Sequence, residues 1–384
     1  MSLLSASVFG TSTKENEKRV PIHPKHLEWI DKEIREKLTF EKGYGEPFGM
    51  NDNELSKWVG DLVTREELFK CSDIMLLPKP GQEDIDSIPK GKILWGWAHC
   101  VQQKGITQTA IDNKLTLITW ESMHRWSKHG DWQMHIFNKN SELAGYSGVL
   151  HSFSLVGING TYGNPKKAIV LSFGSASRGA IHALQGLGVN DITIFTQRYS
   201  TLVADQIVGI NYRHFEADES GNMLAYGMDG HTTCPFIDVL SDADIIVNGI
   251  LQDTNHPLMF VRQNQVDKLK PDCLILDISC DEGMGFEFAK PTSFEAPMFK
   301  VGKTHYYAVD HAPSYLWNSA SWEISNSLLP YLPLVMAGKN RWEESKTLQR
   351  AIEIRDGVVL NNDILSFQNR KREYPHRQKE QNLV

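Results

Sequence analysis

Several features that define common protein classes are missing from this chain of 384 residues. Its longest apolar runs are far too short to span a bilayer, and its first residues show no basic stretch followed by a sustained apolar segment. An excess of positive charge is also missing, because the formal net charge is −7, which argues against a general role in nucleic-acid binding. These absences predict a cytoplasmic protein that binds neither nucleic acid nor membrane.

Cysteine is scarce as well, with five residues scattered through the chain and no C-x-x-C spacing. An odd, scattered set does not form a disulfide framework or a zinc site, so reduced thiols are expected. His124, His129 and His135 lie close to three tryptophans, but their spacing matches no metal motif. We therefore predict no metal site and interpret Cys280 as a small packed side chain.

What the chain does contain is a regular alternation of short apolar runs and helix-like segments. Runs at 72–77, 93–98 and 115–120 precede a long helix, and further runs follow up to about Val309. This spacing predicts parallel α/β sheets. With this length, it indicates two Rossmann-like doubly wound domains with a cleft between them. We expect residues 1–135 plus 316–384 to form a substrate-binding and catalytic domain, and residues 136–315 to form a dinucleotide-binding domain. The charged tail from Arg370 is expected to be frayed.

Residues 168–198 hold the most informative motif. An apolar run over Ala168–Leu171 enters a turn rich in serine and glycine, a helix-like segment follows, and a second β-rich run covers Ile192–Phe195. This is half of a nucleotide-binding βαβ unit, in which a helix N-terminus offers free N–H groups to a pyrophosphate. The usual G-x-G-x-x-G pattern is reduced to S-F-G-S-A-S, and an ordinary buried strand and helix is the alternative interpretation. The expected dinucleotide-binding residues of the turn are Gly174, Ser175, Ala176 and Ser177.

The end of the second run bears on the choice of cofactor. NAD enzymes usually place an acidic residue there, beside the adenosine ribose, whereas this chain has Thr196, Gln197 and Arg198. A neutral residue followed by a guanidinium suits a 2′-phosphate. NADP(H) is therefore the expected cofactor and NAD(H) the alternative, while an ordinary surface arginine is the other interpretation of Arg198.

Titratable residues follow several of the predicted strands, and ligands bind at such carboxyl ends in open α/β sheets. Lys79 lies between two prolines after one run, and His99 follows the next. Asp277 and Asp281 follow a later run, and Arg19 follows the first predicted strand. One arginine, one lysine, one histidine and one carboxylate together suit the reduction of a keto or imino acid.

Each of these side chains has an expected role and an ordinary alternative. Arg19 can fork onto a substrate carboxylate, Lys79 can bind that carboxylate or polarise the carbonyl, and His99 can move a proton near neutral pH. The alternatives are a solvated ion pair, a turn lysine, a core histidine and a capping aspartate. Their joint position at strand ends favours the catalytic interpretation.

In this order the residues resemble the alanine dehydrogenase superfamily, which includes saccharopine dehydrogenase and the nucleotide-binding part of transhydrogenase. TKENEKRVPIHP, DIMLLPKPGQ, ILWGWAH and ILDISCDEG resemble the segments that hold that family's substrate-binding arginine and lysine, catalytic histidine and catalytic aspartate. The resemblance implies these roles for Arg19, Lys79, His99 and Asp281, with Asp281 orienting Lys79 or relaying a proton. NGIL resembles a loop beside the nicotinamide, which adds Asn248, Ile250 and Leu251 to the expected cofactor-binding residues.

Departures from the family pattern indicate which branch of the family, and thus which reaction, the chain resembles. The full glycine pattern is missing, the K-x-K-E-P turn reads L-P-K-P, and a V-x-N-x-P segment reads V-D-H-A-P. Asp310 thus stands where the family has asparagine, and its acid can receive a cationic side chain. These departures resemble the N5-(carboxyethyl)ornithine synthase branch, which condenses pyruvate with the side-chain amine of ornithine or lysine and reduces the imine with NADPH.

The resemblance therefore implies an NAD(P)-dependent oxidoreductase acting on CH–NH bonds, with a 2-oxo acid and an amino acid as small-molecule partners, and we expect a homo-oligomer. Three alternatives stay open: an alanine dehydrogenase using pyruvate, ammonia and NADH, a saccharopine dehydrogenase, and a non-catalytic nucleotide-binding redox sensor. The tryptophans near 120–132 and Trp317 and Trp322 are expected to line either the amine pocket or a subunit interface.

Overall fold

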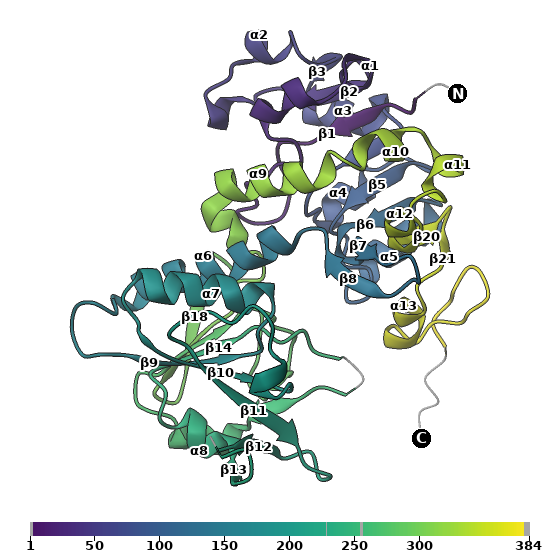
Figure 1. Ribbon diagram of the computed structural model, residues 1–384. Helices are drawn as coiled ribbons and strands as arrows, with labels where there is room; N and C mark the ends of the chain where they lie inside the picture. The colour runs from purple at the N-terminus through teal and green to yellow at the C-terminus, as the bar shows by residue number, and fades with distance from the viewer. Residues whose placement is uncertain (1–2, 228, 254–255, 380–384) are drawn as a thin grey trace. The chain divides into compact units, whose positions relative to one another are not determined.

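A computed structural model describes residues 3–227, 229–253 and 256–379 and divides the chain into two compact units (Figure 1). The first unit contains the chain up to Asn138 and again from Trp317 onward, and the second contains Lys139–Leu316. Each unit is built on a mainly parallel sheet, which confirms the predicted α/β class. Within the described ranges, no helix combines the length and apolar character needed to cross a bilayer.

The sheet of the first unit has the strand order β21-β20-β6-β5-β4-β1-β2-β3. Strands β1 to β6 run parallel, and β20 and β21 are antiparallel additions at one edge. The parallel strands place their carboxyl ends at one edge of the sheet, where ligands bind in such folds. The strands are Ala6–Val8 (β1), Leu38–Glu41 (β2), Asp61–Val63 (β3), Ile74–Leu76 (β4), Ile93–Gly96 (β5), Thr116–Thr119 (β6), Ile352–Arg355 (β20) and Val358–Val359 (β21).

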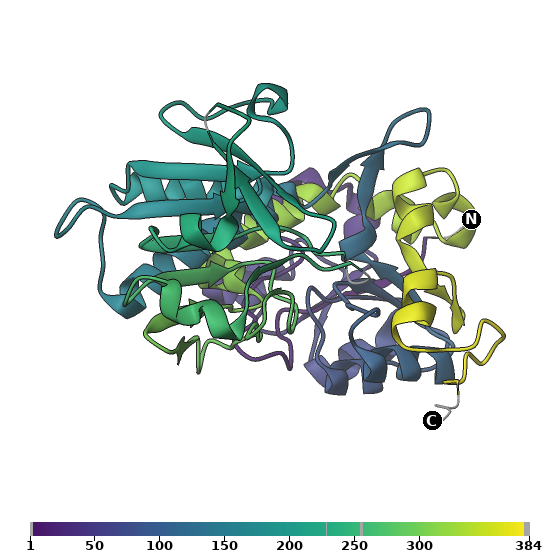
Figure 2. The same ribbon diagram turned by 90° about the horizontal axis from the view of Figure 1, so that it is seen from below.

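Helices cover both faces of this sheet, and successive side chains of β4 point alternately to the two faces. Ile74 and Leu76 pack into one apolar cluster with α9 and α10, whereas Met75 and Leu77 pack into another with α3 to α5. Figure 2 shows the helices of residues 65–112 on one face of the sheet. The helices are Lys32–Arg35 (α1), Asp52–Leu55 (α2), Arg65–Cys71 (α3), Gln82–Asp86 (α4), Lys104–Asp112 (α5), Trp317–Leu328 (α9), Leu332–Met336 (α10), Lys339–Trp342 (α11), Lys346–Ala351 (α12) and Asn362–Phe367 (α13).

Smaller elements complete the first unit. The residues from Pro24 form a 3-10 helix, and the segment with three tryptophans contains a two-stranded hairpin. Trp120 lies fully buried in the core, whereas Trp132 is exposed on the hairpin. These elements are Pro24–Trp29 (η1), Glu46–Phe48 (η2), Trp120–Ser122 (η3), His124–Trp126 (β7) and Trp132–His135 (β8).

The sheet of the second unit has the order β13-β12-β11-β10-β9-β14-β16-β19-β18. Its six central strands, β11 to β19 in that order, are parallel, and the outer pairs are antiparallel. Strand order reverses on either side of β9, the switch point at which doubly wound sheets bind ligands. The strands are Lys167–Leu171 (β9), Asp191–Thr196 (β10), Asn211–Ala217 (β11), Met223–Tyr226 (β12), Thr233–Pro235 (β13), Ile245–Asn248 (β14), Leu274–Asp277 (β16), Met298–Val301 (β18) and Thr304–Tyr307 (β19).

Helices α6 (Asn138–Val156) and α7 (Ser175–Gly186) lie against each other beside this sheet (Figure 1). Gly145 and Gly179 let their backbones touch, because a Cβ at either position would overlap a carbonyl oxygen of the other helix. This contact holds α7 against α6, and the N-terminus of α7 follows β9 after a short turn. A third helix, Phe236–Leu240 (α8), and a parallel strand pair, Met259–Val261 (β15) and Gly285–Phe286 (β17), pack nearby.

The prediction of a frayed tail is wrong for the described part of the C-terminal segment. Arg370 and His376 are only 3% and 1% exposed. Arg370 Nε donates to Gln368 Oε1 at 2.7 Å, and Val359 N donates to His376 Nε2 at 3.0 Å. Hydrogen bonds therefore hold a stretch whose charged composition predicts disorder; residues 380–384 lie outside the described residues.

Candidate active site

Lys79 and His99 follow neighbouring strands of the first unit. The Trp97 N–H donates to Pro78 O at 2.7 Å, so the turn that carries Lys79 is bound to the end of β5. Gly96 permits this approach, because a Cβ there would overlap Leu77 O. Lys79 and His99 are both half-buried. The strand ends thus bring an ammonium and an imidazole into one region of the unit.

The backbone at His99 adopts the left-handed conformation, with φ of 48°. A non-glycine residue in this region costs about 1 kcal/mol or more and is found where surrounding contacts enforce it. The His99 N–H donates to the Glu121 carboxylate, and Gln103 N donates to His99 O at 2.9 Å. Burial and the neighbouring Glu353 raise the pKa of Glu121. Glu121 is a functional candidate that the sequence analysis missed.

Arg19 is brought to the same region, but as half of a buried ion pair. It is 5% exposed, and its Nε donates to Glu17 Oε1 at 2.8 Å. The guanidinium also lies 4.9 Å from the centre of the Trp97 ring. The alternative interpretation of Arg19 as a solvent-exposed ion pair is therefore wrong, because the ion pair is buried. Glu17 joins the candidate site as the residue that orients Arg19.

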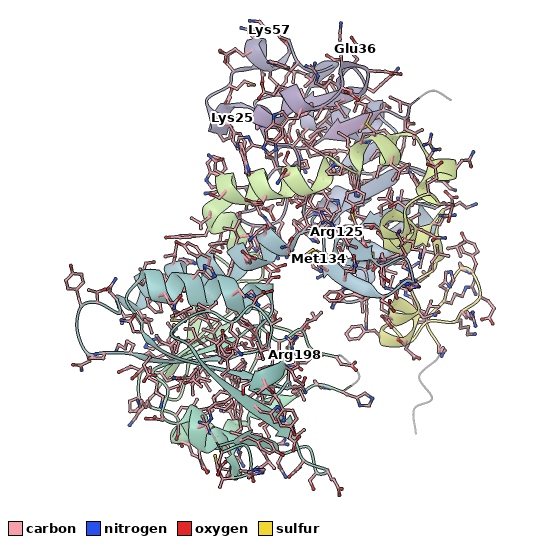
Figure 3. All side chains as sticks on the ribbon, in the orientation of Figure 1. Lys25, Glu36, Lys57, Arg125, Met134 and Arg198 are labelled. Carbon is pink, nitrogen blue, oxygen red and sulfur yellow. The ribbon has the colours of Figure 1, made fainter. Side chains whose placement is uncertain are left out.

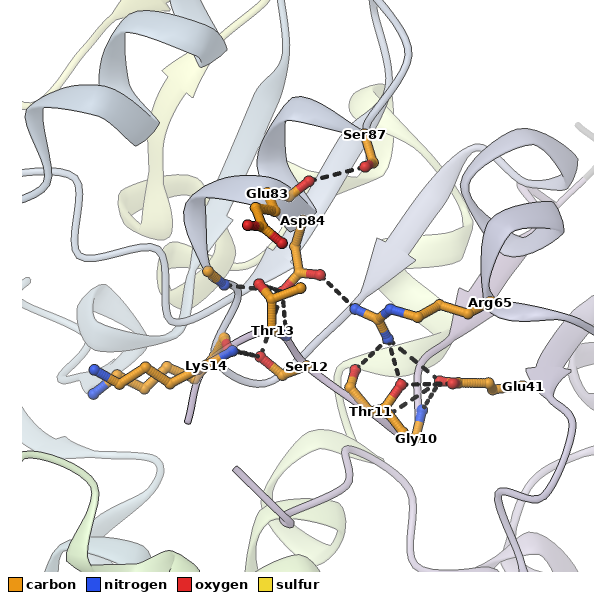
Figure 4. A network of polar contacts seen from close by, with 12 residues as sticks. Gly10, Thr11, Ser12, Thr13, Lys14, Glu41, Arg65, Glu83, Asp84 and Ser87 are labelled. Atoms are coloured by element: carbon orange, nitrogen blue, oxygen red, sulfur yellow. Dashed lines mark hydrogen bonds and ion pairs between the residues drawn. The ribbon is translucent and has the colours of Figure 1, made fainter. Parts of the chain in front are cut away.

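A polar network ties the loop after β1 to the turn that holds Lys79 (Figure 4). Asp84 is 1% exposed and accepts hydrogen bonds from the backbone N–H groups of Thr13 and Gly81, at 3.0 and 2.9 Å. The Ser12 hydroxyl donates to Lys79 O at 2.5 Å. The buried Asp84 carboxylate therefore joins the loop after β1 to the turn that carries Lys79.

Arg65 extends this network toward β2. It pairs with Asp84, and its guanidinium lies 3.5 Å from a carboxylate oxygen of Glu41 (Figure 4). Glu41 in turn accepts from the N–H groups of Gly10 and Thr11, at 2.8 and 3.0 Å. These residues are distant in sequence and come together only in the folded unit, so no local motif marks them.

A cavity of about 410 Å³ opens in the first unit next to this network. Its size is in the range of small-molecule sites. Acidic residues, two lysines and three aromatic side chains lie in its wall. The lining residues are Gly10, Thr11, Glu17, Lys18, Val20, Glu41, Lys42, Gly43, Tyr44, Pro47, Phe48 and Trp317.

In the second unit, the turn between β9 and α7 is shaped by Ser172. Its φ is 77°, a conformation that favours glycine, and it occupies the first glycine position of the usual pattern. The Ser172 hydroxyl lies 3.3 Å from the Ser177 hydroxyl and donates to Gly249 O at 3.2 Å. Gly174 has an ordinary extended backbone, with φ of −84°, and a Cβ there would meet only Ser172 Oγ, at 3.7 Å. The missing Cβ leaves open space where a phosphate would approach.

The loop after β14 is joined to this turn. A Cβ on Gly249 would overlap the Ser177 hydroxyl, and Ile250 N donates to Asn248 Oδ1 at 3.2 Å. Leu251 is 88% exposed. The structure thus gathers Ser175, Ala176 and Ser177 at the N-terminus of α7, with Asn248–Leu251 beside them.

Thr196 and Arg198 lie as the sequence analysis describes them, at the end of β10 next to β9. Thr196 is 4% exposed, and its hydroxyl accepts from Arg198 N at 3.1 Å. The Arg198 side chain is exposed, and Figure 3 labels it on the second unit. No carboxylate occupies the last position of this strand.

A buried acid lies behind the segment that carries Asp281. Asp277 is 1% exposed, accepting from Tyr306 OH at 2.6 Å and Asn248 Nδ2 at 2.9 Å. Burial raises the pKa of Asp277 to about 7 against the opposing effect of these hydrogen bonds. Burial also raises the pKa of Asp281, which is half-buried. Tyr306 connects Asp277 to Cys280, whose sulfur lies 3.3 Å from the phenol oxygen.

Asp310 is paired within its own unit. Its carboxylate contacts Nδ1 of the adjacent His311, which is 2% exposed. His311 also packs against Phe294, with ring centres 5.0 Å apart. The expected role of Asp310 toward a cationic substrate and that of Asp281 toward Lys79 stay predictions. No group of three or more potential metal ligands was found among the described residues.

These features define a class of protein. A doubly wound sheet with a serine- and glycine-rich turn before a helix N-terminus, together with an α/β unit that gathers arginine, lysine and histidine, is typical of nicotinamide-dependent oxidoreductases. The chain belongs to the alanine dehydrogenase/PNT family: residues 11–144 match the model of its N-terminal domain and residues 151–362 that of its C-terminal domain. It is thus an NAD(P)-dependent oxidoreductase of the kind that acts on CH–NH substrates.

Named relatives fall into two groups. The chain is 27% identical over 322 residues to an N(5)-(carboxyethyl)ornithine synthase of Clostridium botulinum, covering 81% of this chain and 89% of that protein. It is 23% identical over 368 residues to an alanine dehydrogenase of Mycolicibacterium smegmatis, covering 91% and 93%. Among solved structures, an L-alanine dehydrogenase matches with a TM-score of 0.74 at 18% identity, covering 95% of this chain and 99% of that one. These similarities confirm the predicted family and the fold of two Rossmann-like domains.

Proposed function

We propose that this chain condenses pyruvate with the side-chain amine of an amino acid such as ornithine or lysine and reduces the imine with NADPH. The observation that carries this proposal is the cavity of about 410 Å³ beside the Glu17–Arg19 pair. Ammonia needs no such volume, whereas an amino acid needs apolar walls for its chain and charged groups for its ends. Phe48, Trp317 and Lys42 supply both.

The residues of the second unit fit a dinucleotide. The N-terminus of α7 and the open space at Gly174 suit a pyrophosphate, and Ser175, Ala176 and Ser177 would hold it through their backbone N–H groups. Arg198 would bind the 2′-phosphate of NADPH. Asn248, Ile250 and Leu251 would lie along the nicotinamide. Bound NADPH supplies the hydride for reduction.

The first unit supplies the groups that act on the 2-oxo acid. Arg19, oriented by Glu17, binds the carboxylate, and Lys79 binds the same group or polarises the carbonyl oxygen. His99 gives a proton to the departing hydroxyl during imine formation and takes one from the attacking amine. The left-handed backbone at His99 orients the ring for these transfers.

The first experiment is a set of assays of NADPH and NADH oxidation with pyruvate or 2-oxoglutarate plus, separately, ammonia, ornithine, lysine and arginine. We expect turnover with NADPH and a diamino acid and little with ammonia. Turnover with NADH and ammonia would instead make this an alanine dehydrogenase, a possibility that the relatives of that name favour. Turnover with lysine only when 2-oxoglutarate replaces pyruvate would indicate a saccharopine dehydrogenase. Tight NADPH binding without any turnover would indicate a redox sensor.

Replacing Phe48 with alanine tests the location of the amine. Phe48 packs edge-on against Trp317, with ring centres 5.2 Å apart, and lines the cavity. Removing its ring takes apolar surface from the amino-acid chain, so the KM for the amine should rise about fivefold while the KM for pyruvate stays the same. Initial-rate kinetics with each substrate varied in turn give both constants.

Phe367→Ala is the matched control for Phe48→Ala. Phe367 is 43% exposed on α13 and does not line the cavity, so its loss should leave both KM values unchanged. An unchanged KM for the amine in Phe48→Ala would show that the amino acid binds elsewhere.

A further inference from the structure

The C-terminal segment makes contacts with the loop that follows His99. Gln368 is 1% exposed, and its Nε2 donates to Cys100 O at 2.6 Å and to Val101 O at 3.1 Å. Thr107 adds a hydroxyl that donates to Cys100 O at 2.7 Å. Two consecutive carbonyls directly after His99 are therefore held by an amide from a residue more than 260 positions later.

Gln368 is itself fixed. Its Oε1 accepts from Arg370 Nε at 2.7 Å, and Arg370 NH1 donates to Gln108 Oε1 on α5 at 2.8 Å. Arg370 NH1 also donates to His376 O at 3.3 Å, which ties the segment back on itself. The amide of Gln368 has one orientation that satisfies all these partners, because its oxygen faces a guanidinium and its nitrogen faces carbonyls.

Strand β20 contributes a second acidic residue near the His99 loop. Glu353 is 3% exposed and accepts from Ser122 Oγ at 2.6 Å and Asn361 Nδ2 at 3.1 Å. Glu353 lies close enough to Glu121 to raise the pKa of that carboxyl, and Glu121 accepts the hydrogen bond from the His99 N–H. One buried carboxylate oxygen of each, Glu121 Oε2 and Glu353 Oε2, has no hydrogen-bond partner among the described residues.

The loop from His99 to Val101 is thus held on its N–H side by Glu121 and on its carbonyl side by Gln368. The backbone at His99 is in a sparsely populated conformation that such contacts must enforce. The match to the C-terminal family model ends at residue 362, so Gln368 and Arg370 lie outside the matched region. We propose that residues 368–376 form a strap that positions His99 for proton transfer, with Gln368 as its main positioning residue. This inference rests on the proposed role of His99.

Replacing Gln368 with methionine removes the amide at nearly constant volume, so the unit should fold. We expect kcat to fall about tenfold, because the ring of His99 loses its alignment, while the Kd for NADPH and the KM for pyruvate stay the same. The pH profile of kcat should also change, since the imidazole would meet different neighbours. Gln368→Glu, which places an acceptor against two carbonyl oxygens, should lose more activity than the methionine variant.

Gln349→Met is the matched control, because the Gln349 amide donates to Glu343 on the surface and touches no part of the His99 loop. Amide hydrogen exchange of residues 99–103 should be faster in Gln368→Met than in the wild type or this control. Wild-type kcat in Gln368→Met, or a parallel loss of NADPH affinity and thermal stability, would overturn the strap. If the wild type turns over none of the tested substrates, the proposed function fails, and the exchange rates alone then decide the strap.

Discussion

Replacement of His99 with glutamine should lower kcat about a thousandfold, within the range of roughly 10²–10⁴ that general acid–base catalysis contributes. Glutamine keeps hydrogen-bonding atoms but cannot gain and lose a proton near neutral pH, so imine formation should slow. The Kd for NADPH should not change, because the expected dinucleotide groups all belong to the other unit. Steady-state rates from pH 5 to 9 and a fluorescence titration with NADPH measure the two quantities.

His129→Gln serves as the control for the histidine prediction. His129 is exposed in the turn between β7 and β8, and its loss should leave kcat at the wild-type value. Near-normal turnover in the His99 variant would mean that another group transfers the proton. Lys79, on the neighbouring strand end, would be the next residue to examine.

Removal of the Arg198 side chain should reduce the preference for NADPH over NADH by about 10- to 100-fold, the value of one or two hydrogen bonds to a charged group. The effect should appear in the KM for NADPH and not in kcat, because the 2′-phosphate lies far from the reacting carbon. Thr196 leaves no acidic residue at the strand end to favour NADH instead. The ratio of kcat/KM for the two cofactors measures the change.

Arg125→Ala provides a matched arginine control, since Arg125 is exposed on β7 of the first unit (Figure 3). Its removal should leave the cofactor ratio unchanged. If Arg198→Ala keeps the full preference for NADPH, the 2′-phosphate is bound by other groups, and the interpretation of Arg198 as a surface arginine holds.

The elements that carry Lys79 and His99 could be predicted because their signals are local. Strands β4 and β5 arise from apolar runs, and a titratable residue follows three positions after each strand ends, Lys79 after Leu76 and His99 after Gly96. Ser172 shows the limit of such signals: serine itself does not favour the left-handed backbone found at this glycine position of the pattern, and the contacts of its hydroxyl with Ser177 and Gly249 are seen only in the folded unit.

Residues that act through distant partners could not be predicted. Asp84 looks like an ordinary surface charge in sequence, yet it is buried, and its carboxylate accepts a hydrogen bond from the Thr13 N–H in the loop after β1. The charged stretch from Arg370 has the composition of a disordered tail. Its described part, residues 370–379, is ordered because the Arg370 guanidinium meets a carbonyl on α5 and the amide of the preceding Gln368 meets a carbonyl after β5, which no local pattern reveals.

The split of the first unit has a consequence for how the protein is made. Strand β6 pairs with β20, and the Thr119 hydroxyl donates to Ala351 O across a separation of 232 residues. During synthesis the whole second unit leaves the ribosome before β20 does. Until then the edge of β6 has unpaired backbone groups that can attract other chains. The second unit can therefore fold while the last strands of the first unit are still being synthesised.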